Sequence, residues 1–405
     1  MEWIRRLLLP EGAEPSALPL LVGRALRAFA DGYVAILLPA YLLALGFGTW
    51  EVGLLASATL LGSAMATLAL GAWGHRFHSR RLLLGAAALM AATGLAFALG
   101  SSFWPLLAIA FVGTLNPSSG DVSVFLPLEH ARLAGAAHGD ARTALFARYS
   151  LAGALFAALG ALAAALPDRL VAVAGVARLD ALRAMFVAYA LVGGAVWLLY
   201  RRLPAPDAQA QQPPGPLGPS RAVVLKLAAL FSLDSFAGGL VINALLALWL
   251  FQRFDLSLAA TGAFFFWTGL LGAASQLAAP RLARRIGLVN TMVFTHIPAN
   301  LCLVAAAFSH HREVALGLLL VRALLAQMDV PARGAFVMAV VSPAERAAAA
   351  SFTLVPRSLA SAISPTLGGA MFAAGWLAAP LVACGVLKIA YDLMLWRAFR
   401  GVKPP

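Results

Sequence analysis

The sequence is poor in charged residues and in cysteine. Only 12% of its 405 residues are charged, whereas about 25% is usual in a soluble domain, so the composition excludes a water-soluble fold. The two cysteines, Cys302 and Cys384, lie inside long apolar runs, where a thiol behaves as a small hydrophobic side chain. They therefore say nothing about the redox compartment.

The chain also lacks the motifs that membrane-embedded enzymes need. It has no Asp-rich pair motif for Mg²⁺ and no Gly-x-Ser-x-Gly elbow. His75, His78, His130 and His138 lie in or beside expected loops, without a Cys-rich or His-x-x-x-His pattern. We therefore expect no enzyme activity, no cofactor and no metal site, with a lipid-modifying membrane enzyme as a remote alternative.

Long apolar runs make up most of the chain, and 61% of its residues are hydrophobic. A helix needs about 20 residues to cross the hydrocarbon layer, so twelve crossings use nearly the whole sequence. We predict an all-α membrane protein with spans near 18–45, 51–74, 82–100, 103–128, 143–166, 184–200, 222–251, 257–279, 288–308, 314–341, 350–374 and 377–398. The first run has charged residues and no cleavage site, so we expect a retained span rather than a signal peptide.

The basic residues outside the spans fall mostly on one side. If the N-terminus is cytoplasmic, most loop Lys and Arg residues lie in cytoplasmic loops. The positive-inside rule then predicts a multi-pass protein of the inner (cytoplasmic) membrane with both termini in the cytoplasm. The net charge of +13 follows from this topology, and we expect no nucleic-acid partner.

A Pro-rich segment at 204–219 separates the sixth and seventh spans. It cannot form a helix and predicts an extended cytoplasmic linker. We predict a six-helix bundle over 1–201, the linker over 202–220 and a second six-helix bundle over 221–405. The bundles echo each other, since Asp31 and Asp234 lie at similar depths in the first and seventh spans. Parallel repeats of this kind are a known transporter plan.

The loop after the second span carries a recognisable motif. It resembles the signature Gly-x-Leu-Ala-Asp-Arg-x-Gly-Arg-Lys of the major facilitator superfamily: Gly71 and Arg76 match, Arg80 stands at the final basic position, and His75 replaces the acid. The resemblance covers essentially the whole chain. Within the superfamily, the sequence resembles bacterial drug and small-solute exporters. It implies two six-helix halves, alternating access and a gating loop that contains Gly71, Arg76 and Arg80.

Ionisable residues inside spans are the candidate transport residues, because charge at membrane depth is costly unless it faces a cavity or a partner. Arg24, Arg27 and Asp31 lie on one face of the first span. Asp31 is either a proton carrier or half of a static Arg27–Asp31 pair. Asp234 has no base four residues away, so we expect an unpaired carboxylate and a proton carrier, with an interhelical hydrogen bond as the alternative.

Spans four, ten and eleven supply further candidates. The polar run 116–121 predicts an unwound or water-lined segment, and Pro331 is expected to free a carbonyl near Gln327. Arg357 can hold an anion or pair with Asp329, and Lys388 is expected to neutralise Asp392. The predicted cavity residues are Arg27, Asn116, Asp121, Asn243, Arg322, Gln327, Asp329, Arg333, Arg357 and Ser361.

The expected function is secondary active transport by alternating access. One version is proton-coupled export of a small organic compound, with Asp31 and Asp234 as proton carriers. The other is an organic or inorganic anion permease or exporter that uses cavity arginines, because basic residues outnumber acids inside the spans. A receptor or scaffold would not need matched acids in both halves. The expected partners are a small-molecule substrate, protons and the lipid bilayer, and we expect a monomer.

Overall fold

The computed structural model describes residues 9–118, 123–204, 218–342 and 345–401, and the regular secondary structure in these ranges is helical. Ten helices or helix pairs in this part of the chain are long and apolar enough to cross a membrane. The two other predicted spans correspond to the pair α5 (Phe103–Val112) and α6 (Phe125–Gly135) and to α16 (Arg346–Ala373). Most of the predicted linker, 205–217, lies outside the described residues.

Contacts divide the chain into two units. Unit 1 comprises residues 1–48, 58–211 and 256–266, and unit 2 comprises 49–57, 212–255 and 267–405. Because 49–57 and 256–266 group with the other half of the sequence, the boundaries predicted at 201 and 221 stay a prediction. The helices not yet given begin with η1 (Pro15–Ala17), α2 (Leu18–Ala44), α3 (Thr49–Trp73), η2 (Gly74–Arg76), α4 (Ser79–Leu99), α7 (Gly139–Ala163), α8 (Leu166–Ala174) and α9 (Arg178–Tyr200). They continue with α10 (Arg221–Gly239), α11 (Asn243–Phe254), α12 (Leu258–Ile286), α13 (Leu288–Phe308), α14 (Arg312–Ala326), α15 (Asp329–Val340) and α17 (Ala379–Phe399).

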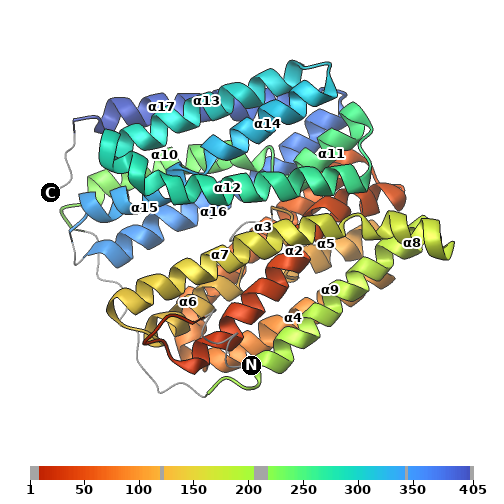
Figure 1. The fold of residues 1–405 in the computed structure, drawn as a ribbon, viewed down its shortest axis with the longest axis horizontal. Helices are drawn as coiled ribbons and strands as arrows, with labels where there is room; N and C mark the ends of the chain where they lie inside the picture. The colour runs from red at the N-terminus through yellow and green to blue at the C-terminus, as the bar shows by residue number, and fades with distance from the viewer. Residues whose placement is uncertain (1–8, 119–122, 205–217, 343–344, 402–405) are drawn as a thin grey trace. The chain divides into compact units, whose positions relative to one another are not determined.

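In unit 1, α2 packs against α7 and α9, and α4 packs against α9 (Figure 1). The α2–α7 contact is backbone to backbone, because a Cβ built on Gly32 would lie 2.1 Å from the carbonyl oxygen of Ala157 and one on Gly160 would lie 2.0 Å from that of Phe29. In a membrane, helices associate through such close packing rather than through hydrophobic burial. These two glycines therefore set the distance between α2 and α7.

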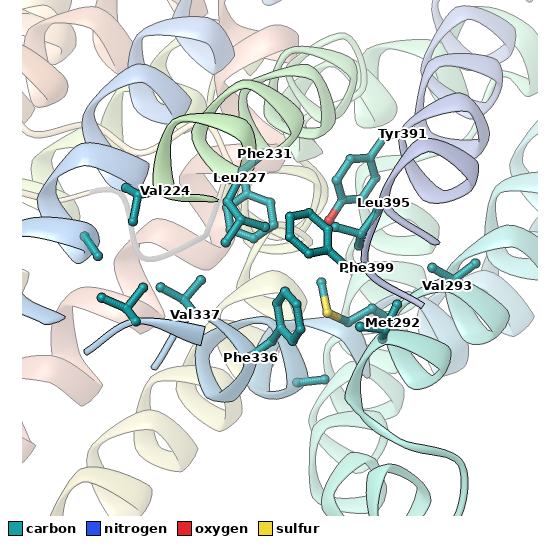
Figure 2. Close-up of a cluster of buried hydrophobic side chains, with 14 residues drawn as sticks. Val224, Leu227, Phe231, Met292, Val293, Phe336, Val337, Tyr391, Leu395 and Phe399 are labelled. Atoms are coloured by element: carbon teal, nitrogen blue, oxygen red, sulfur yellow. The ribbon is translucent and has the colours of Figure 1, made fainter. Parts of the chain in front are cut away.

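In unit 2, α10 packs against α16 and α17, and α13 packs against α14, α15 and α17 (Figure 1). Apolar side chains from α10, α13, α15 and α17 meet in a buried cluster, in which Phe231, Phe336, Tyr391 and Phe399 are the large members (Figure 2). Phe336 and Phe399 form an edge-to-face pair with ring centroids 5.4 Å apart, a geometry that contributes about 0.5–1.5 kcal/mol beyond area burial. This cluster holds the four helices together next to their charged residues.

The residues that lead into α10 are bound by the loop between α15 and α16. Glu345, which is only 5% exposed, accepts hydrogen bonds from the hydroxyls of Ser342 (2.6 Å) and Ser220 (2.7 Å) and from the backbone N–H of Gly218. These donors, the Ser342 and Ser220 hydroxyls first, lower the pKa of Glu345 to about 2. A carboxylate at the N-terminus of α10 also satisfies N–H groups that the helix itself leaves unpaired.

Candidate functional site

Helix breaks occur inside three of the predicted spans. Residues 113–118 between α5 and α6 are not helical and include Asn116, whereas Asp121 lies outside the described residues. The seventh span breaks between Gly239 and Asn243, and the tenth breaks at Gln327, before α15 begins. Broken backbone is tolerated at membrane depth only where protein or a water-filled cavity surrounds it, so the breaks mark where a site can form in each unit.

The charged centre of unit 1 is Glu129 on α6, whose side chain is fully buried. Arg27 Nη2 lies 2.5 Å from both of its carboxylate oxygens, and the hydroxyls of Tyr149 and Tyr200 donate to the same carboxylate. The guanidinium of Arg27 also lies 3.9 Å from the ring centroid of Phe125. Donors from α2, α7 and α9 therefore converge on a single carboxylate from α6.

Glu129 is not among the predicted site residues, because the predicted fourth span ends at residue 128. An acid one residue beyond an apolar run, in sequence that continues as a helix, was the signal that could have revealed it. The structure also adds a role for Arg27, which forms an ion pair with Glu129 and interacts electrostatically with Asp31 as well.

Asp31 lies on α2 next to this centre and is 8% exposed. Its carboxylate accepts a side-chain hydrogen bond from Asn116 and interacts electrostatically with both Arg27 and Arg24. The amide oxygen of Asn116 is itself bonded to the backbone N–H of Ser118 (3.1 Å) and to its hydroxyl (2.8 Å). A buried carboxylate is thus linked directly to the non-helical segment between α5 and α6.

In unit 2, Asp234 on α10 is paired with two cations. Lys388 Nζ on α17 lies 2.6 Å from one carboxylate oxygen, and Arg333 Nη2 on α15 lies 3.0 Å from the other. The expectation of an unpaired Asp234 was wrong, and the interhelical alternative is what the structure contains. Both partners come from helices distant in the sequence, so spacing along α10 could not reveal them. Arg333 also pairs with Asp329 one turn away.

The predicted Lys388–Asp392 pair was also wrong. Lys388 reaches Asp234, while Asp392 faces His296 on α13, whose Nδ1 lies 3.0 Å from each carboxylate oxygen. His296 is 4% exposed and Asp392 is fully buried. His296 is not among the predicted site residues because it lies inside an apolar run. The signal that could have revealed it is its presence as an ionisable residue within a span.

The remaining cavity candidates are spread over unit 2. Arg357 Nε donates to the Ser235 hydroxyl at 2.8 Å, whereas Asp329 takes Arg333, so the predicted Arg357–Asp329 pair is not formed. Arg322 is half-buried, and its Nε has no hydrogen-bond partner among the described residues. Gln327 is exposed and accepts a hydrogen bond from the side chain of Gln276 (3.3 Å). Ser361 is half-buried and donates to the Ser358 carbonyl one turn away (3.0 Å). Asn243 is half-buried at the start of α11.

The predicted gating loop lies at the end of α3. Gly71 is in the last turns of α3 and Arg76 ends η2, and both are exposed. Arg80 donates to the Arg201 carbonyl at the end of α9 (2.6 Å), and Arg132 bonds the Ser79 hydroxyl and the Pro204 carbonyl, each at 2.9 Å. Arg80 and Arg132 therefore tie the loop after α3 and the start of α4 to α6 and to the end of α9 within unit 1.

Comparison with known proteins identifies the fold. Residues 20–326 match the family model described as Major Facilitator Superfamily. The chain is 23% identical, over 93% of its length and 92% of the relative, to the uncharacterized membrane protein YJR124C of Saccharomyces cerevisiae.

Two solved structures are similar over nearly their whole length. A D-xylose-proton symporter matches with a TM-score of 0.73 at 16% identity, covering 94% of this chain and 97% of that one. The human organic anion transporter MFSD10 matches with a TM-score of 0.65 at 19% identity, covering 94% and 99%. At these identities the likeness shows the fold, and it confirms the predicted all-α membrane architecture.

Proposed function

Because the chain belongs to the Major Facilitator Superfamily and is therefore a multi-pass secondary transporter rather than an enzyme, we propose that it couples export of a small organic compound to proton movement. Alternating access is the mechanism we assign to it. From the distribution of basic residues we also propose the cytoplasmic membrane, with both termini in the cytoplasm.

The observation that carries the proposal is the link between Asp31 and Asn116. The Asp31 carboxylate is buried close to the charges of Arg24 and Arg27, and both burial and neighbouring charges act on a proton-binding group. The balance therefore depends on how much water reaches the cluster. A proton added to Asp31 changes its bond to Asn116, and Asn116 lies in the helix break between α5 and α6. Proton binding and rearrangement of this segment are thus coupled through one hydrogen bond.

Asp234 takes a different role in this proposal from the one its sequence context suggested. Its carboxylate is held by Lys388 and Arg333, so a proton can replace the ionic contacts only after a cation has moved away. We therefore assign the first proton-binding step to Asp31. The D-xylose-proton symporter, as its name states, couples a solute to a proton, which supports the use of this fold for proton coupling.

The test is transport by the purified protein in proteoliposomes that contain an internal pH dye. Amphiphilic cations and small anions are supplied as separate pools, and Asp31→Asn is compared with Asp180→Asn, which changes an exposed acid. We expect a solute-dependent pH change that Asp31→Asn abolishes and Asp180→Asn retains. Solute movement without any pH change in the wild type would refute proton coupling. Accumulation in inverted, energised vesicles tests the export direction.

Organic anion transport is a second candidate, favoured by the arginines of unit 2. Arg357 is half-buried and donates to a serine hydroxyl rather than to a carboxylate, and Arg322 has an Nε without a partner in the described part of the chain. Guanidinium groups bind carboxylates and phosphates in a bidentate manner. Arg357→Gln should abolish uptake of an anion pool, whereas export of an uncharged or cationic solute should continue.

A further inference from the structure

The His296–Asp392 dyad of unit 2 lies outside the part of the chain that binds protons in the proposal above. Nδ1 of His296 faces both oxygens of Asp392 at 3.0 Å, so it is bonded whatever the charge of the ring. No hydrogen bond to its Nε2 is found among the described residues. The ring can therefore accept a proton at Nε2 without losing its contact with Asp392. Histidine is the side chain whose charge ordinarily changes between pH 5 and 8.

Lys388 lies one turn before Asp392 on α17, and residues at this spacing are neighbours on a helix surface. The lysine nevertheless contacts Asp234 on α10, at 2.6 Å. Lys388 thus has two carboxylates within its range, one across the helix interface and one on its own helix. Which of them attracts it more strongly depends on whether Asp392 is already neutralised by a protonated His296.

Asp234 keeps one cationic contact if Lys388 leaves, with Arg333, which it shares with Asp329. Arg333 Nη2 already lies 3.0 Å from its second oxygen. The other terminal nitrogen of Arg333, Nη1, is buried and has no hydrogen-bond partner among the described residues. The same is true of the Tyr391 hydroxyl. A spare donor is therefore in place next to Asp234. Because an unpaired charge inside a protein is costly, this spare donor makes partner exchange by Lys388 energetically feasible.

The charged groups around the dyad come from every helix that packs near it. From α17 they are Lys388, Asp392 and the Tyr391 phenol, whose ring centroid is 6.3 Å from that of His296. Asp234 on α10 interacts electrostatically with His296, and α15 brings Asp329 and Arg333. Arg357 on α16, which interacts electrostatically with Asp234 and Asp329, and Arg322 on α14 are both half-buried. With His296 neutral, Asp392 has no cation of its own in this set.

We propose that His296 is a proton-binding residue and that its charge decides which carboxylate Lys388 holds. With a proton on Nε2, the imidazolium neutralises Asp392, and Lys388 keeps the contact with Asp234 that the structure contains. When that proton leaves to solvent, Asp392 regains an uncompensated charge and attracts Lys388 along its own helix. The ion pair between α10 and α17 is then broken, and Asp234 keeps Arg333. The role in transport rests on the proposed function, but the exchange itself is measured without a solute.

The test is a double-mutant cycle on the thermal unfolding midpoint. The midpoint is measured by tryptophan fluorescence on the purified full chain in detergent, at pH 5.5 and at pH 8. The single variants are Lys388→Met, Asp234→Asn and Asp392→Asn, and the doubles combine Lys388→Met with each acid. We expect Lys388 and Asp234 to be non-additive at pH 5.5 and additive at pH 8, and Lys388 and Asp392 to show the reverse. In a His296→Gln background, the pattern of additivity expected at pH 8 should be found at both pH 5.5 and pH 8. The control substitution His138→Gln should leave the pH dependence of both pairs unchanged. Non-additivity that does not change with pH would refute the exchange.

A second measurement needs only single variants. The ¹⁵N-histidine spectrum of the wild type is recorded from pH 5 to 8, and the His296 signal is assigned by its loss in His296→Gln. We expect that signal to titrate and to shift its midpoint in Asp392→Asn. A ring that keeps one charge state across the range refutes the proposal even if the double variants do not fold. Failure of solute-coupled pH changes in the proteoliposome assay would leave both of these results unaffected.

Discussion

Replacing Glu129 by Gln should strongly destabilise unit 1. The substitution keeps the size of the side chain and one oxygen acceptor but removes the charge that Arg27, Tyr149 and Tyr200 share. Arg27 is 3% exposed, so it would stay buried with its main counter-charge gone. Removing one partner of a buried ion pair costs about 3–5 kcal/mol. We expect a loss of this size in the free energy of unfolding.

The assay is reversible unfolding in mixed micelles, followed by tryptophan fluorescence. Asp180→Asn is the matched control, because it breaks an exposed pair with Arg183 at 3.4 Å, and such pairs contribute about 0–1 kcal/mol. The double variant Arg27→Met with Glu129→Gln should recover most of the loss, since it leaves no buried charge unpaired. If Glu129→Gln costs no more than Asp180→Asn, the reasoning that places a charged carboxylate at this centre is wrong.

Three further predictions concern packing and loops. Gly32→Ala should lower unfolding free energy by about 1–3 kcal/mol, because its Cβ would meet the α7 backbone, whereas Gly194→Ala, with open space around it, should be neutral or slightly stabilising in the same unfolding assay. Tyr41→Phe should cost about 1–3 kcal/mol in that assay, because its buried hydroxyl donates to the backbone carbonyls of Phe97 and Gly100 at the end of α4. The pKa of Glu345 is lowered to about 2. The charged carboxylate therefore stabilises the folded protein at pH values above its ordinary pKa, and this stabilisation is lost as the pH falls toward 2. The difference in melting temperature between wild type and Glu345→Gln should be constant near pH 7 and shrink below about pH 4.

Each of these predictions fails in its own way. Equal effects of Gly32→Ala and Gly194→Ala would mean that α2 and α7 can separate freely. An unfolding free energy that Tyr41→Phe leaves unchanged would mean that water can replace the hydroxyl as the donor to these carbonyls. A wild-type melting advantage over Glu345→Gln that persists at pH 3 would mean that the Ser342 and Ser220 hydroxyls do not hold the carboxylate in its charged form.

The sequence by itself determined the architecture of this protein. Helix length and apolar content are local properties, and the thickness of the bilayer converts them directly into a number of spans. The family resemblance followed from the same local features, with Gly71 and Arg76 in their expected loop, and the family match confirmed it. The polar run that begins at Asn116 also indicated a helix break, since a charged or amide side chain in a span implies an irregular or wet environment.

Only the tertiary structure decided which charges meet. Spacing along one helix predicted Lys388–Asp392 and offered Arg27–Asp31 as one of two alternatives. In the structure Lys388 pairs with Asp234, and Arg27 pairs with Glu129, a partner that spacing could not reveal. A one-helix pattern counts neighbours at i+3 and i+4, whereas a buried charge takes the partner with the best geometry and the most hydrogen bonds among all adjacent helices. His296 became visible as part of the site for the same reason, because α13 and α17 lie side by side only in the folded chain (Figure 1).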